Sequence, residues 1–309
     1  MNLLMLIGGL FALLLGGDWL VRSSVSLSSR LKLSPLIVGM TIVSIGTSAP
    51  ELMVSVKASM SGFPDMAMGN VIGSNIANIS LILGLTALVI SIPVNRETLT
   101  FSWPAMLLAS LMVFAFSLNS SIERWEGIIL LSALPLFIYL LWRRAKKSNA
   151  PIDAENTKSY NLVFSLVLLG LGVTGLVYGA NFMIRGAIGL AEALGVSERV
   201  ISLTIVAFGT SVPELATSLV AAFRKQMDIS VGNLIGSNIF NIFGILGISS
   251  IINPVGVSPQ MLHIDIPVAI GIVLLLGLCF IPLKRPVISR WKGLILIVFY
   301  LAYFYIVFN

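Results

Sequence analysis

The sequence predicts an all-α polytopic membrane protein with ten transmembrane helices, arranged as two inverted-topology repeats of five helices each. Three observations support this fold class: the composition, a duplicated pair of motifs, and the distribution of Lys and Arg. Of the 309 residues, 57% are hydrophobic and only 10% are charged, whereas a soluble domain carries roughly 25% charged residues. Such a composition is typical of a chain that crosses a bilayer many times.

Two motifs occur twice with the same spacing. Residues 46–52 read GTSAPEL and residues 209–215 read GTSVPEL. Residues 69–78 read GNVIGSNIAN, and residues 232–241 read GNLIGSNIFN. In both cases the second copy follows the first by 163 residues, the distance from Glu51 to Glu214. A constant offset for two separate motifs predicts an internal repeat.

Hydrophobicity places the helices, because a spanning helix needs about 20 mostly apolar residues. We predict ten, with ends accurate to about two to four residues, over residues 3–30, 34–60, 66–91, 98–118, 124–142, 160–192, 198–222, 228–252, 262–281 and 287–307. Residues 1–142 then form the first repeat and 160–309 the second. The polar stretch 143–159 is predicted to be a cytoplasmic linker between them.

The basic residues predict the orientation of the helices. With the N-terminus outside, fifteen of the 19 Lys and Arg residues fall in inside loops, as the positive-inside rule requires. Only four fall outside: Lys57, Arg124, Arg185 and Arg199. We therefore expect a multi-pass protein of the cell (inner) membrane with both termini outside. Five helices per repeat is an odd number, so the second repeat inserts upside down, as in many secondary transporters.

Glu51 and Glu214 are predicted to lie near the middle of their spans. A charged residue there costs on the order of 2.5–3.5 kcal/mol on insertion scales, and no Lys or Arg lies within a helical turn of either glutamate. A bound cation would offset that cost. The alternative is a structural ion pair or hydrogen bond between helices.

The same motif predicts a broken helix. Pro50 cannot donate to the carbonyl of Gly46, and Pro213 cannot donate to that of Gly209. Non-helical backbone within a membrane occurs where it lines a cavity or binds an ion. Thr47 and Ser48, four and three residues before Glu51 respectively, would add hydroxyl oxygens on the same helix face, and Ser44 continues that face.

The second motif adds amide and hydroxyl oxygens. Ser74 and Asn78 are four residues apart, as are Ser237 and Asn241. For the other asparagines, hydrogen bonding between helices is at least as well supported as ligation; these are Asn70, Asn75, Asn233 and Asn238. The donor set contains oxygen only, which favours hard cations over zinc, copper or iron. Two glutamates with freed carbonyls suit calcium better than magnesium.

With these motifs the chain resembles the cation/calcium exchanger superfamily and, within it, the prokaryotic sodium/calcium exchangers. The resemblance covers both halves and implies ten helices in two inverted halves. By motif position it implies twelve ion ligands, six in each repeat. Those of the first repeat are Glu51, Thr47, Ser48, Ser74, Asn78 and the backbone carbonyl of Ser44. Those of the second are Glu214, Thr210, Ser211, Ser237, Asn241 and the backbone carbonyl of Ala207.

Two positions bear on the counter-ion. Several sodium/calcium exchangers carry Asp where this chain has Asn241, so the resemblance makes potassium co-transport less expected. The calcium/proton branch typically has a glutamate where this chain reads Gly-Ser-Asn, which favours sodium over protons.

The sequence thus predicts a secondary antiporter that exchanges Ca²⁺ for Na⁺ by alternating access; the alternative is a calcium, or other divalent cation, antiporter coupled to protons. A cation channel would not need an inverted repeat of broken helices. An enzyme is not expected, because no Ser/His or Cys/His set accompanies the single histidine, His263. We expect no cofactor, nucleic acid or obligate protein partner, only the bilayer and the two transported ions.

Overall fold

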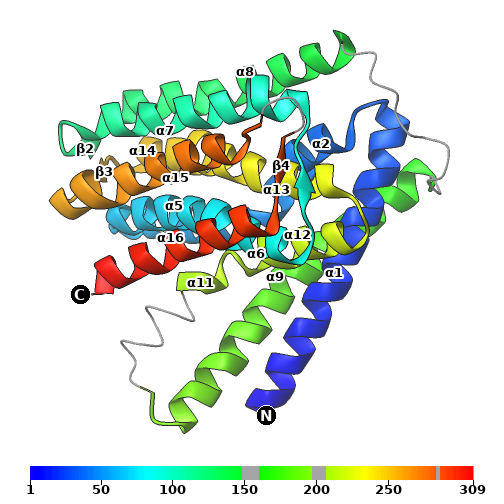
Figure 1. Cartoon of the computed structure of the whole chain (residues 1–309). Helices are drawn as coiled ribbons and strands as arrows, with labels where there is room; N and C mark the ends of the chain where they lie inside the picture. The colour runs from blue at the N-terminus through cyan, green and yellow to red at the C-terminus, as the bar shows by residue number, and fades with distance from the viewer. Residues whose placement is uncertain (148–159, 197–206, 283–285, 309) are drawn as a thin grey trace. The chain divides into compact units, whose positions relative to one another are not determined.

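The computed structural model describes residues 1–147, 160–196, 207–282 and 286–308, which form helices, four two-residue strands and the turns and loops that connect them (Figure 1). Within these residues, eight helices are long and apolar enough to cross a membrane, and a bent pair would make a ninth. The helices of the first half are α1 (Asn2–Leu31), α2 (Pro35–Val38), η1 (Gly39–Val43), α3 (Ser44–Thr47), α4 (Ala49–Met60), α5 (Pro64–Ile76), η2 (Ala77–Ile82), α6 (Leu83–Val89), η3 (Thr98–Ser102), α7 (Trp103–Ser117) and α8 (Arg124–Lys147), where η denotes a π-helix.

The second half contributes α9 (Leu162–Ala193), α11 (Ala207–Gly209), α12 (Val212–Phe223), α13 (Met227–Phe240), η5 (Asn241–Leu246), α14 (Gly247–Ile252), η6 (Met261–Asp265), α15 (Ile266–Cys279) and α16 (Arg290–Phe308). The predicted span 198–222 begins outside the described residues, and its described part comprises the three-residue α11 and the 12-residue α12. The number ten therefore stays a prediction.

The fifth helix is longer than predicted. It continues to Lys147 instead of ending at residue 142, and residues 148–159 of the predicted linker lie outside the described residues. Two basic side chains of this extension lie over aromatic rings. The Arg144 guanidinium lies 4.5 Å from the Phe101 ring centroid, and the Lys146 ammonium lies 3.8 Å from the Trp142 ring centroid. Cation–π contacts stabilise charged side chains beside an apolar helix, so the helix extends past its apolar run.

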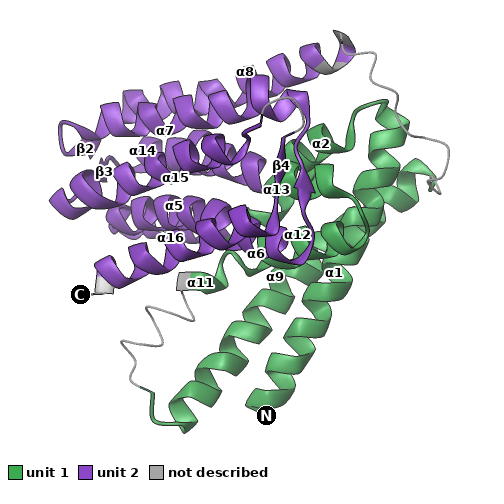
Figure 2. Cartoon of the chain, viewed as in Figure 1, with its two compact units in different colours: residues 1–50, 149–233 green, residues 51–148, 234–309 purple. Residues whose placement is uncertain are grey.

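The chain divides into two compact units (Figure 2). Unit 1 comprises residues 1–50 and 149–233, and unit 2 comprises residues 51–148 and 234–309. Each unit therefore takes segments from both halves of the sequence.

In unit 1, α1 packs along α9 through glycines. A Cβ atom on Gly9 would lie 2.7 Å from the carbonyl oxygen of Gly179, and one on Gly16 would lie 2.8 Å from that of Gly172. Small residues let two helices approach closely in a membrane, where association depends on van der Waals packing. Gly9 and Gly172 are 163 residues apart, as are Gly16 and Gly179, so equivalent positions of the repeat contact each other reciprocally.

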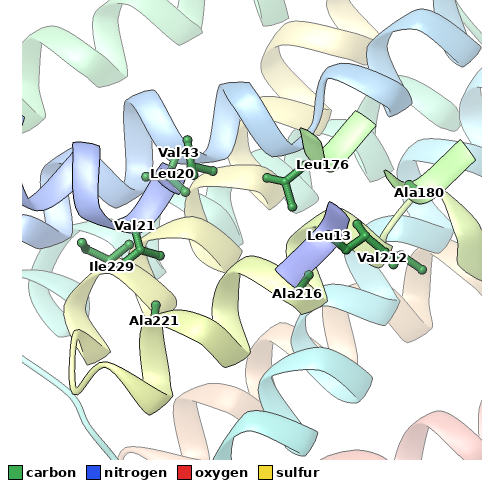
Figure 3. Close-up of a cluster of buried hydrophobic side chains, with 10 residues drawn as sticks. All are labelled: Leu13, Leu20, Val21, Val43, Leu176, Ala180, Val212, Ala216, Ala221 and Ile229. Carbon is green, nitrogen blue, oxygen red and sulfur yellow. The ribbon is translucent and has the colours of Figure 1, made fainter. Parts of the chain in front are cut away.

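A cluster of buried apolar side chains joins further helices of unit 1 to this pair. Figure 3 shows ten of its members, which come from α1, η1, α9, α12 and α13: Leu13, Leu20, Val21, Val43, Leu176, Ala180, Val212, Ala216, Ala221 and Ile229. The cluster fixes α12, which carries Glu214, against α1.

Unit 2 contains four short strands that pair across the two halves of the sequence. β1 (Ile92–Pro93) pairs with β4 (Val287–Ile288), and β2 (Ser121–Ile122) pairs with β3 (Val255–Gly256), both antiparallel. β1 and β3 are 163 residues apart. Each strand of the first half thus finds its partner in the second half, as the glycines of α1 and α9 do.

Candidate functional site

Both copies of the first motif interrupt a helix at the same position. The chain adopts φ −83° and ψ 11° at Ser48, between α3 and α4, and φ −89° and ψ 3° at Ser211, before α12. The helical segments on either side of Ser48 are bent by 49°. These interruptions confirm the broken helix predicted from the proline. The spacing of Thr47 and Glu51 alone predicted that both lie on one continuous helix face. The break at Ser48 separates them, so they do not.

Unit 1 brings the two copies of this motif into direct contact. The Ser48 hydroxyl donates to Oε1 of Glu214 at 2.9 Å, and neither side chain is exposed. Oε2 of Glu214 has no hydrogen-bond partner among the residues that the structure describes. A buried carboxylate oxygen without a partner is costly, so this oxygen is suited to bind a cation.

The hydroxyls around this contact differ between the copies. Thr47 Oγ1 donates to Oδ1 of Asn233 at 2.9 Å, and Asn233 Nδ2 donates to Ser218 Oγ at 3.2 Å. In the second copy, Thr210 Oγ1 and Ser211 Oγ have no partner within the described part of the chain. Unit 1 thus holds the hydroxyls of Thr47 and Ser48 in hydrogen bonds and leaves those of Thr210 and Ser211 available as ligands.

The backbone at the two predicted carbonyl ligands also differs. The Ser44 carbonyl accepts the Ser48 N–H at 2.9 Å, whereas the Ser211 N–H donates to the Phe208 carbonyl at 3.1 Å. The Ser44 hydroxyl donates to the Met40 carbonyl at 2.8 Å, so its side chain is used within the helix. Ligation by the carbonyls of Ser44 and Ala207 remains a prediction.

Unit 2 contains Glu51, whose residue is 1% exposed. Its backbone carbonyl accepts Asn70 Nδ2 at 3.2 Å, and the same nitrogen donates to Ser55 Oγ at 2.9 Å. Asn70 therefore bonds Ser55 as Asn233 bonds Ser218, at equivalent positions of the repeat. Both asparagines support the helix that carries a glutamate.

Unit 2 also brings the two copies of the second motif together. Asn75 Nδ2 donates to the Asn238 carbonyl at 3.2 Å, and Asn241 Nδ2 donates to Asn75 Oδ1 at 3.0 Å. Ser74 is buried. Several polar atoms have no hydrogen-bond partner among the described residues: both amide atoms of Asn78, Oδ1 of Asn241 and Oγ of Ser237.

The sequence left open whether the remaining asparagines bind ions or join helices. The contacts of Asn70, Asn75 and Asn233 confirm hydrogen bonding between helical segments, while Asn238 Nδ2 donates within its own helix, to the Leu234 carbonyl at 2.8 Å. The repeated Gly-Asn and Ser-Asn pairs of the motif indicated that these asparagines have a structural role. The sequence did not specify which group each asparagine bonds.

Across the described residues, no group of three or more His, Cys, Asp or Glu side chains could hold a metal ion. In each unit the two motifs instead supply one buried glutamate with neutral hydroxyl and amide oxygens. Such a set binds hard cations such as Na⁺ and Ca²⁺ and offers no soft ligand to zinc or copper.

Comparison with known proteins identifies the family. The family profile described as sodium/calcium exchanger protein matches residues 1–143 and 164–309. The CaxA protein of Alkalimonas amylolytica is 37% identical over 97% of each chain. The sodium/calcium exchanger MaX1 of Methanosarcina acetivorans is 32% identical over 99% of this chain and 98% of its own. A structure of the sodium-calcium exchanger NCX_Mj, soaked with Na⁺ and Ca²⁺, covers 97% of this chain and 96% of its own, with a TM-score of 0.84 and 34% identity. The chain therefore belongs to the sodium/calcium exchanger family of multi-pass membrane proteins, which exchange cations and are not enzymes.

Proposed function

We propose that this protein is a secondary antiporter that exchanges Ca²⁺ for Na⁺ by alternating access. The contact between the Ser48 hydroxyl and the Glu214 carboxylate carries the proposal, because it joins the two copies of the motif at a buried carboxylate whose other oxygen has no partner among the described residues. The proposed ligands are the predicted twelve: Glu51, Thr47, Ser48, Ser74, Asn78 and the Ser44 carbonyl, with Glu214, Thr210, Ser211, Ser237, Asn241 and the Ala207 carbonyl.

The charge of these residues explains why two kinds of ion exchange. Glu51 and Glu214 contribute two negative charges, and the other ten ligands are neutral. One Ca²⁺ or two Na⁺ neutralises that charge, which would otherwise be costly within a membrane. A protein loaded with either ion can change conformation, whereas an unloaded protein would carry two unneutralised carboxylates.

In many secondary transporters, alternating access is performed by two halves of opposite orientation. The reciprocal pairs β1–β4 and β2–β3 support a two-fold relation between the repeats, and the reciprocal glycine contacts of α1 and α9 support it in unit 1. Together with the distribution of Lys and Arg, these contacts favour ten helices and both termini outside the cell.

The relatives support the choice of ions. MaX1 is named a sodium/calcium exchanger, and the structures of NCX_Mj include crystals soaked with Na⁺, Ca²⁺ or Sr²⁺. The Gly-Ser-Asn sequence of the second motif, without a glutamate, favours Na⁺ over protons as the counter-ion.

The test is Ca²⁺ uptake into proteoliposomes. Vesicles loaded with Na⁺ are diluted into Na⁺-free buffer that contains Ca²⁺, and a matched set carries a pH gradient without Na⁺. We expect uptake with the Na⁺ gradient alone. Uptake driven only by the pH gradient would assign the protein to calcium/proton exchange, and flux without either gradient would indicate a channel.

A further inference from the structure

We propose that Asn75 is a positioning residue that orients the amide of Asn241, so that Asn241 presents its carbonyl oxygen to the transported ion. This inference rests on the proposed function, because it assumes that Asn241 is an ion ligand. Asn75 itself would not bind the ion, since both ends of its side chain are used within unit 2.

The first step of the argument is the orientation of Asn241. Its side chain is fully buried, and its Nδ2 donates to Asn75 Oδ1 at 3.0 Å. Oδ1 of Asn241 has no hydrogen-bond partner in the described residues. Because the two ends of a primary amide point in different directions, a hydrogen bond that holds the nitrogen also fixes where the oxygen lies. That oxygen is the end that a cation needs.

The second step is that Asn75 cannot reverse its own amide at low cost. Asn75 Nδ2 donates to the backbone carbonyl of Asn238 at 3.2 Å. A reversed Asn75 would set its oxygen against that carbonyl and its nitrogen against the nitrogen of Asn241. Two acceptors or two donors that face each other form no hydrogen bond. The Asn238 carbonyl therefore fixes Asn75, and Asn75 in turn fixes Asn241.

The third step is that the other repeat lacks this arrangement. Asn238, the equivalent of Asn75, donates to the Leu234 carbonyl of its own helix at 2.8 Å. Both amide atoms of Asn78, the equivalent of Asn241, are without a partner among the described residues. Position 241 is thus held from one side, whereas position 78 is not, although the two motif copies are nearly identical in sequence.

The arrangement also selects the residue type at position 241. A carboxylate has no hydrogen to donate and would face Asn75 Oδ1, another acceptor. Asn75 therefore matches a neutral amide at position 241.

The test is a double-mutant cycle, measured as the half-saturating Na⁺ and Ca²⁺ concentrations of Na⁺-driven Ca²⁺ uptake. We expect Asn241→Ala to weaken the apparent affinity for at least one ion. Asn75→Ala should weaken the apparent affinity for the same ion by about 2- to 10-fold, which is the effect of one hydrogen bond. The double variant should lose no more than Asn241→Ala alone, because the two residues act as one unit. Asn75→Leu fills the space of Asn75 without hydrogen-bonding atoms and should behave like Asn75→Ala, so a folded variant is available if the alanine substitution disrupts packing.

Asn238→Ala is the matched control, since it removes the equivalent buried asparagine and leaves the backbone carbonyl that Asn75 uses. We expect its half-saturating concentrations to stay within about twofold of the wild type, because the hydrogen bond that its Nδ2 donates stays within its own helix. The inference is overturned if the Asn75 variants keep wild-type half-saturating concentrations, if the losses of Asn75→Ala and Asn241→Ala add, or if Asn238→Ala matches Asn75→Ala. Wild-type protein without Na⁺-driven uptake would instead refute the proposed function.

Discussion

Thr47 and Thr210 occupy the same position in the two copies of the first motif, yet their surroundings differ. Thr47 donates to Asn233, whereas Thr210 Oγ1 has no partner in the part of the chain that the structure describes. In the second motif the order is reversed: Asn241 of the second copy donates to Asn75, and the amide of Asn78 in the first copy has no hydrogen-bond partner among the described residues. Two near-identical sequences thus form different hydrogen bonds, as expected of an antiporter whose halves adopt different conformations in any one state.

The largest effect should come from the glutamates, where the copies are expected to be equivalent. Glu51→Gln and Glu214→Gln each remove half of the negative charge that matches Ca²⁺, and each should reduce Na⁺-driven Ca²⁺ uptake by about 100-fold or more. Glu192→Gln, which changes an exposed carboxylate of α9, is the control and should transport normally. Near-normal flux in either glutamate variant of the motif would refute the assignment of the ligands.

Substitution of Ser48 and of Ser211 should affect Ca²⁺ transport to different extents. Ser48→Ala removes the hydrogen bond to Oε1 of Glu214, and a hydrogen bond to a charged group is worth about 1.5–3 kcal/mol. We expect the half-saturating Ca²⁺ concentration to rise by about 10-fold or more. Ser211→Ala removes a hydroxyl without a partner among the described residues and should have the smaller effect. Equal losses for the two serines would show that the Ser48–Glu214 contact is not what distinguishes them.

Substitution of the two threonines should change the stability of the protein by different amounts. Thr47→Val leaves Oδ1 of Asn233 buried without its donor, which should destabilise the fold by about 1–3 kcal/mol. Thr210→Val replaces a buried hydroxyl without a partner in the described residues by a methyl group and should be neutral or stabilising. Thermal unfolding in detergent, with Ca²⁺ chelated, measures both variants. A Thr210→Val protein that melts as low as Thr47→Val would remove the difference between the copies.

The smallest effect is expected for Asn241→Asp. The added carboxylate should change the Na⁺ dependence of uptake by a few fold and alter the Ca²⁺ affinity less, because the Ca²⁺ charge is already matched by the two glutamates. The Na⁺ Hill coefficient and the half-saturating concentrations are the quantities to measure. An unchanged Hill coefficient would count against Asn241 as a ligand for Na⁺.

Much of the fold could be predicted from hydrophobicity, because eight of the described helices are long and apolar enough to cross a membrane. The break at Ser48 followed from Pro50, whose missing N–H acts locally. The end of α8 could not be predicted fully, because one of the two contacts of its last turns joins Arg144 to Phe101, which is distant in the sequence.

The candidate site shows the same limit. The ligand types of the site could be read from the two motifs, but the partners of the asparagines could not. Asn75 and Asn238 have the same neighbours in sequence, and only the packing of α5 against the second half of the chain decides that one bonds another helix and the other its own.

The strand pairs have a consequence for synthesis of the protein. β1 pairs with β4, and the ribosome completes Val287 about 195 residues after Ile92. At roughly 5–20 residues per second, β1 waits about 10–40 s for its partner. The glycine face of α1 waits for α9 in the same way. During that time the first half of the chain resides in the membrane with its pairing surfaces uncovered, so the insertion machinery or the surrounding lipid must shield them until the second half arrives.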